Sequence, residues 1–186
     1  MKVILIIKNL VKLPRPWLRG VGLVLFVCLS ACSSVKTIPN SNNINSPYND
    51  GNPTLSGDGR WLALVSNRAG VNQIYLYDLE KQEFAPLPGL TRGDGLLDNP
   101  SLSRTARYMT YVSLIDGRPV VNLYDRVLKR SEILTKTYRY WFRNPSISSD
   151  GRYLVLETSR RGQWDIEVID RGPNIELDIP DGTPIK

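Results

Sequence analysis

The sequence predicts an all-β fold of three four-stranded antiparallel propeller blades, a partial or half propeller. The first observation is a motif of Asn-Pro, Thr or Ser, an apolar residue and Ser, which begins at Asn52, Asn99 and Asn144. The copies lie 47 and then 45 residues apart, a period that is typical of propeller blades. The second observation is that an Asp follows each Asn after 26 positions, so insertions fall only between copies (Asp78, Asp125 and Asp170).

Within each copy, the motif predicts a first strand followed by a turn. The Asp-Gly pairs at 58–59 and 150–151 favour a tight turn with positive φ, which Gly adopts at little cost. The second copy has Thr105-Ala106 in that place and predicts a weaker turn.

The remaining strands are predicted from runs of aromatic and β-branched residues. We expect second strands at 61–66, 108–113 and 153–158, and third strands at 74–78, 121–125 and 166–170. Fourth strands are expected at about 83–87, 130–134 and 175–179, with Pro86 and Pro88 suiting an outer edge. The period of two in the third strands predicts an apolar face that packs on a neighbouring blade (Ile74 and Leu76, Val121 and Leu123, Ile166 and Val168).

The N-terminal residues 1–31 have the arrangement of a signal peptide, with a basic part followed by the apolar run 21–29. The sequence Leu29-Ser30-Ala31-Cys32 resembles the lipobox of bacterial lipoproteins. That resemblance implies cleavage before Cys32 and acylation of the cysteine, which would anchor the chain to a membrane. An ordinary signal peptide and a membrane-spanning helix are the alternatives. Residues 32–51 are rich in Asn, Ser and Pro and are predicted to form a disordered tether.

The formal charge of +6 is concentrated in the predicted signal peptide, which holds five basic residues and no acidic one. Without these five, 19 basic residues face 18 acidic ones. Non-specific binding to nucleic acid depends on clustered basic charge, so no nucleic-acid partner is predicted.

From Asn52 to about residue 180, the three motifs and the later Ile-Tyr-Leu-Tyr-Asp-Leu at 74–79 resemble the TolB-like propeller family. The blades are expected at about 52–98, 99–143 and 144–186. The resemblance implies a propeller in the bacterial cell envelope, on the periplasmic side. TolB itself has an additional N-terminal domain and six blades, and it contacts the peptidoglycan-associated lipoprotein. If the cell is Gram-negative, Ser33 after the lipid-bearing cysteine favours the outer membrane.

An arc of three blades leaves the outer faces of its first and last blades without a neighbour. We expect a homodimer in which two arcs close a six-bladed ring, or another protein that completes the propeller. A stable open arc is the third possibility.

The sequence predicts no catalytic residue, metal site or cofactor. It contains no His, and no Cys follows Cys32, so the usual nucleophile and base pairs are missing. The recurring acids are interpreted as turn and strand caps (Asp58, Asp78, Asp125, Asp150 and Asp170). A glycan hydrolase that uses carboxylates, or a structural component of envelope assembly, is the alternative to a binding protein.

The stretch from Thr137 to Arg143 departs from the repeat and combines aromatic residues with two Arg. Such side chains dominate binding surfaces, so a site for an envelope protein or glycan is predicted here (Tyr138, Arg139, Tyr140, Trp141 and Arg143). The competing interpretation is that Trp141 and Phe142 fill the groove between two blades. The predicted function is that of a non-catalytic envelope lipoprotein that binds a protein or glycan partner.

Overall fold

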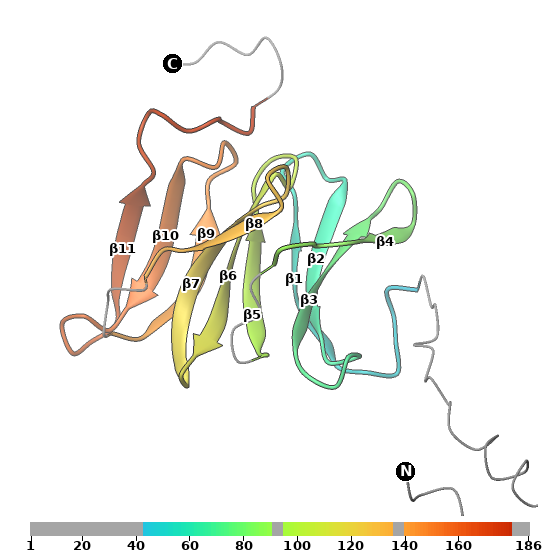
Figure 1. The fold of residues 1–186 in the computed structure, drawn as a ribbon, viewed down its shortest axis with the longest axis horizontal. Coiled ribbons are helices and arrows are strands. Elements are labelled where there is room, and N and C mark those ends of the chain that lie inside the picture. Colours follow the sequence, from blue (N-terminus) through green and yellow to red (C-terminus); the bar gives the residue numbers. More distant parts are fainter. Residues whose placement is uncertain (1–42, 91–94, 136–139, 180–186) are drawn as a thin grey trace, which may run out of the picture. The chain divides into compact units, whose positions relative to one another are not determined.

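The computed structural model describes residues 43–90, 95–135 and 140–179, which form three twisted antiparallel sheets arranged in sequence order (Figure 1). The predicted signal peptide, the lipidation site Cys32, most of the predicted tether, Tyr138 and Arg139 lie outside these residues. Within the described ranges, the structure contains no helix of the length and hydrophobicity that a membrane span requires.

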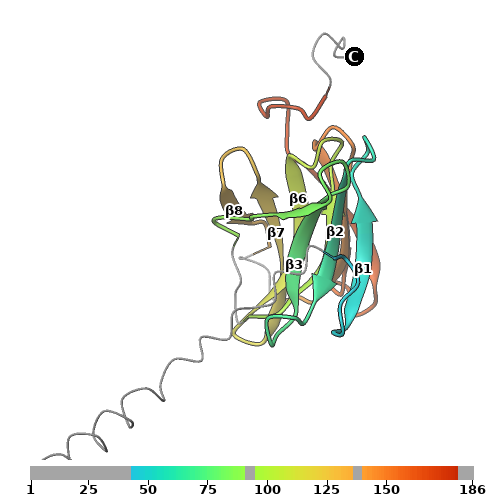
Figure 2. The ribbon, with the colours of Figure 1, turned by 90° about the vertical axis from the view of Figure 1, so that its right-hand side faces the viewer.

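Each sheet lies in the region of one predicted blade, but its first strand begins two residues before the motif Asn, so residues 50–51 of the predicted tether belong to β1. Blade 1 has the order β1-β2-β3-β4, with β1 (Asp50–Leu55), β2 (Trp61–Ser66), β3 (Gln73–Asp78) and β4 (Glu83–Ala85). Blade 2 has the order β5-β6-β7-β8, with β5 (Leu97–Leu102), β6 (Tyr108–Ile115), β7 (Arg118–Asp125) and β8 (Arg130–Ile133). Blade 3 has the order β9-β10-β11, with β9 (Phe142–Ile147), β10 (Tyr153–Thr158) and β11 (Asp165–Asp170). Figure 2 views blade 1 from its outer side, with β1, β2 and β3 side by side.

The fourth strand predicted for blade 3 at 175–179 is wrong, because that segment pairs with no strand among the described residues. It follows the turns of blades 2 and 3 instead. The Asp178 N–H donates to the carbonyl of Asp150 at 2.8 Å, and the Tyr108 hydroxyl donates to the carbonyl of Glu176 at 2.6 Å. The alternation of apolar and acidic residues had the period of a strand, but the acids find their partners on blade 2. In blade 1, β4 ends at Ala85, shorter than predicted, because Pro86 cannot donate to the ladder.

The Asn of each motif lies on a β-bulge. Asn52, Asn99 and Asn144 have φ values of 47°, 49° and 50°, in the left-handed region that Asn tolerates better than most residues. The register of β1 shifts between Gly51 and Thr54, so the intervening Pro lies where no N–H is needed. The Asn-Pro pair is therefore explained by the backbone of the innermost strand.

The motif Ser fixes the turn that follows. The hydroxyls of Ser56, Ser103 and Ser148 each accept a hydrogen bond at 2.9 Å from the N–H of the residue five positions later. Three positions after each Ser, the chain enters the left-handed region, with φ of 75° at Gly59, 56° at Ala106 and 80° at Gly151. The turn of blade 2 thus forms without Gly.

The core lies between the blades rather than within them. We call the face that a blade turns toward the following blade its forward face, and the opposite face its back face. The forward face of blade 1 packs on the back face of blade 2 (Trp61, Ala63, Val65, Ile74 and Leu76 against Leu97, Leu102, Met109, Tyr111 and Tyr124). The forward face of blade 2 packs on the back face of blade 3 (Tyr108, Val121 and Leu123 against Phe142, Ile147, Leu154 and Leu156). The predicted packing of third-strand residues is confirmed in blades 1 and 2, whereas Ile166 and Val168 of blade 3 are exposed.

Candidate binding surface

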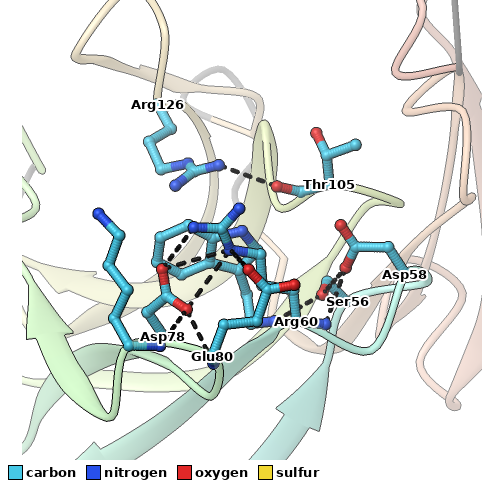
Figure 3. A network of polar contacts seen from close by, with 9 residues as sticks. Ser56, Asp58, Arg60, Asp78, Glu80, Thr105 and Arg126 are labelled. Carbon is cyan, nitrogen blue, oxygen red and sulfur yellow. Dashed lines mark hydrogen bonds and ion pairs between the residues drawn. The ribbon is translucent and has the colours of Figure 1, made fainter.

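The repeated Arg and Asp of the three blades form one structural unit. Arg60 lies 2.8 Å from Asp78, Arg107 lies 3.6 Å from Asp125, and Arg152 lies 2.9 Å from Asp170. The hydrogen bond from Arg60 lowers the pKa of Asp78, and that from Arg152 lowers the pKa of Asp170. Figure 3 shows the unit of blade 1, where Arg126 of blade 2 approaches and donates to the carbonyl of Thr105 at 2.9 Å.

The acids of the turns and strand ends all cap neighbouring backbone. Asp58 accepts from the Ser56 hydroxyl and the Arg60 N–H, and Asp150 accepts from the equivalent groups of Ser148 and Arg152. At the strand ends, the N–H groups of residues two or three positions later donate to the carboxylate at 2.8–3.2 Å (Asp78, Asp125 and Asp170). These contacts agree with the interpretation of the acids as caps.

In blade 2, the missing turn carboxylate is supplied by Asp178. Its oxygens accept from the Ser103 hydroxyl at 2.6 Å, the Thr105 N–H at 2.7 Å and the Thr105 hydroxyl at 2.6 Å. Next to it, Arg107 donates to Glu176 at 2.6 Å, which raises the pKa of Arg107 and lowers that of Glu176. The segment that follows β11 is therefore attached to the turn of blade 2.

The predicted aromatic site divides into a buried and an exposed part. Phe142 is buried between blades 2 and 3 with Val121 and Leu156, so the groove-filling interpretation holds for this residue. Trp141 is 58% exposed and Tyr140 is 40% exposed. The backbone of Trp141 is fixed nevertheless, because its N–H donates to the Ser159 hydroxyl and its carbonyl accepts from the Ser159 N–H, both at 3.0 Å.

Arg143, the other described member of the predicted site, is held in place by blade 3. Its guanidinium donates to Glu157 at 2.6 Å and lies 4.0 Å from the ring centre of Trp164. Glu157 also accepts from Asn144 at 2.9 Å, and the hydrogen bonds from Asn144 and Arg143 lower the pKa of Glu157. Glu157 and Trp164 were not predicted. The sequence does contain a signal for Trp164: it is spaced by two positions from Ile166 and by four from Val168, a spacing that places the three side chains on one face.

An open pocket of about 240 Å³ lies at the turn between β10 and β11, the turn that carries Trp164. Two Arg and two acids give it a polar lining that suits hydroxyl or charged groups (Thr158, Arg160, Arg161, Asp165, Ile166 and Glu167). Exposed aromatic rings and a polar pocket thus occur on the same blade.

Neither a family model nor a curated protein matches the chain. Among solved structures, the chain is similar to TolB from Acinetobacter baumannii, with a TM-score of 0.59 and 20% identity over 69% of this chain and 31% of that one. It is also similar to a putative TolB from Agrobacterium tumefaciens, with a TM-score of 0.54 and 22% identity over 74% of this chain and 51% of that one. The three sheets have a TolB-like propeller fold.

The chain is also similar to a solved structure of another kind of protein. A prolyl endopeptidase structure matches with a TM-score of 0.51 and 16% identity over 75% of this chain and 23% of that one. This chain spans about a third to a half of the length of the two TolB structures, and its blades correspond to part of a propeller.

Proposed function

We propose that this chain is a non-catalytic, lipid-anchored protein of the bacterial envelope, and that its TolB-like blades bind an envelope protein or glycan through the segment around Trp141. The observation that carries the proposal is the exposure of the Trp141 ring, whose backbone Ser159 fixes, with the exposed Tyr140 next to it. Exposed aromatic rings stack on sugars and on planar side chains, and they are enriched at binding surfaces.

A binding role is supported by the use that the fold makes of its repeated polar residues. The motif serines hold the turns, the repeated Arg and Asp pair with each other, and the remaining turn acids cap backbone N–H groups. Residues used for the framework in all blades do not distinguish one ligand from another. Specificity then depends on the stretch in which the repeats differ.

The envelope setting is proposed from the lipobox at Leu29–Cys32, together with the TolB-like fold. A lipid on Cys32 would hold the blades at the membrane surface on the periplasmic side, the outer membrane in a Gram-negative cell. There the binding surface would meet both peptidoglycan and envelope proteins.

The test compares Trp141→Ala with Tyr48→Ala, which removes an exposed aromatic ring before blade 1. Immobilised protein is exposed separately to solubilised peptidoglycan fragments and to periplasmic proteins, and the thermal unfolding midpoint of each variant is measured. We expect Trp141→Ala to lose capture of one of these two probes while its unfolding midpoint stays that of the wild type, and Tyr48→Ala to retain capture. If Trp141→Ala binds as the wild type does, or loses stability in step with binding, the site is wrong.

A further inference from the structure

The two outer faces of the three-blade arc expose apolar residues whose counterparts are buried between blades. On the forward face of blade 3, Ile166 is 68% exposed and Val168 is 60% exposed. The residues in the same positions of blades 1 and 2 are at most 5% exposed (Ile74, Leu76, Val121 and Leu123). Blade 3 therefore has an apolar face of the same kind as its neighbours, but none of the described segments covers it.

The back face of blade 1 shows the complementary exposure. Leu55 is 57% exposed, whereas Leu102 and Ile147, which take its place in blades 2 and 3, are 7% exposed. Within the structure, Leu102 belongs to the same cluster as Leu76 of the preceding blade. Leu55 is thus the residue expected to meet a position such as Val168.

A second pair of positions, Tyr153 in blade 3 and Leu79 in blade 1, is also exposed where the equivalent residues of other blades are in contact. The aromatic residue at the start of β2 and β6 is covered by an Arg of the next blade: Arg126 lies 4.1 Å from the ring centre of Trp61, and Arg171 lies 4.3 Å from that of Tyr108. In blade 3 the same position is Tyr153, which is 40% exposed. The residue that corresponds to Arg126 in blade 1 is Leu79, which is also exposed.

The outer strands of blade 1 are covered on their back face, as those of blade 2 are. In blade 2 the cover is the segment between β4 and β5, where the Tyr124 hydroxyl donates to the carbonyl of Pro88 at 2.8 Å. In blade 1, Arg68 lies 4.9 Å from the rings of Tyr75 and Phe84 and donates to the carbonyl of Ile44 at 3.1 Å. On this back face Leu64 is 3% and Tyr77 is 6% exposed, so the part of blade 1 that stays open lies around Leu55 and Leu79.

We propose that the forward face of blade 3 packs on the back face of blade 1 in a second copy of this chain, and that two copies close a ring. Val168 and Ile166 then meet Leu55, and Tyr153 meets Leu79. Two identical contacts related by a two-fold axis close such an assembly and leave no end face exposed.

The experiment measures the molar mass of the chain as cells produce it, in one mild detergent for all variants, by light scattering and by sedimentation. The wild type should have twice the monomer mass, while Leu55→Asp and Val168→Asp should each be monomeric with an unchanged circular dichroism spectrum. Both side chains are exposed in the single chain, so the substitutions spare its core. Val127→Asp, at an exposed apolar residue between β7 and β8, is the matched control and should remain dimeric.

A second experiment cross-links blade 1 of one copy to blade 3 of another. Leu55→Cys and Val168→Cys, made in separate chains and mixed, should be linked by a short bismaleimide, and neither variant should be linked to itself. A monomeric wild type, a mass of three or more copies, or dissociation by Val168→Asp without dissociation by Leu55→Asp would each overturn the proposal. Leu55→Asp changes no residue of blade 3, so failure of assembly is distinguishable from failure of partner binding at Trp141.

Discussion

The carboxylate of Asp178 accepts a hydrogen bond from the hydroxyl of Ser103 at 2.6 Å, although 75 positions separate the two residues. In blades 1 and 3 the same bond is made within the turn, by Ser56 with Asp58 and by Ser148 with Asp150. The motif Ser thus binds a carboxylate in all three blades. The carboxylate comes from the turn itself in blades 1 and 3 and from a distant residue in blade 2.

Asp178→Ala is expected to destabilise the protein by about 2–3 kcal/mol, because it removes a charged acceptor of three hydrogen bonds and leaves the buried Ser103 hydroxyl without its carboxylate. Adding Thr105→Asp to this variant should recover part of the loss, since it restores the local arrangement of blades 1 and 3. Urea unfolding of the single and double variants measures both effects.

The matched control for that restoration is Thr105→Asp alone. In the wild-type background it places a second carboxylate beside Asp178 and should destabilise the protein. If Thr105→Asp changed the stability in the same direction with and without Asp178, the assignment of Asp178 as the missing turn residue would be contradicted.

Gly151→Ala should be much more destabilising than Gly59→Ala, although both glycines occupy the same turn position. An added Cβ at Gly151 would lie 2.4 Å from Cδ2 of the buried Tyr108 ring, whereas at Gly59 it meets nothing within 4 Å. Gly59→Ala should cost about 1–2 kcal/mol for a left-handed Ala, as Ala106 already tolerates. Gly151→Ala should cost a further 1–3 kcal/mol for overpacking. Equal losses in urea unfolding would show that Tyr108 does not constrain the turn.

Stability should fall when the pH falls below about 4, the ordinary range of Asp and Glu. The pKa values of Asp78, Asp170 and Glu176 are lowered in the folded protein by hydrogen bonds from Arg60, Arg152 and Arg107. A group with a lowered pKa stabilises the fold above its unfolded pKa, and this contribution is lost as the pH falls through the folded pKa.

Glu176→Gln tests one part of this pH dependence. The gap in thermal unfolding midpoint between wild type and variant should be largest at neutral pH and should close in acid. Glu132→Gln, on the outer strand of blade 2, is the control with the same change of charge. A gap for Glu176→Gln that does not vary with pH would show that its pair with Arg107 contributes nothing.

Labelling with radioactive palmitate in growing cells is expected to mark the wild type and not Cys32→Ala. The reason is that lipid transfer to the lipobox requires the thiol of Cys32. Cys28→Ala is the control, since it lies four residues earlier and should leave labelling intact. Equal labelling of all three proteins would exclude the anchor.

Much of the fold follows from local sequence. The second strands begin at Trp61, Tyr108 and Tyr153 as predicted, because the turn residues and the period of two are both local signals. The fourth strand of blade 3 could not be excluded in the same way. Its alternation is that of a strand, and the contacts of Glu176 and Asp178 with blade 2 depend on tertiary structure.

The aromatic segment shows a similar limit. The sequence identifies Trp141 and Phe142 as unusual, but successive residues of an extended chain point to opposite sides, and the pattern does not say which side is covered. Only the position of blade 2 makes Phe142 the buried one. Trp164 was missed because it belongs to no repeated motif, and its contact with Arg143 joins the turn before β11 to β9.

The bond between Asp178 and Ser103 also has a consequence for folding. Every residue that makes the side-chain hydrogen bonds of the blade 1 turn lies between Ser56 and Trp61, so these bonds can form as soon as that short segment is free to fold. Blade 2, although it precedes blade 3 in the chain, needs residue 178 for the same purpose. The order in which the turns can be completed therefore differs from the order of the blades in the chain, and a chain truncated within blade 3 would leave the turn of blade 2 unfinished.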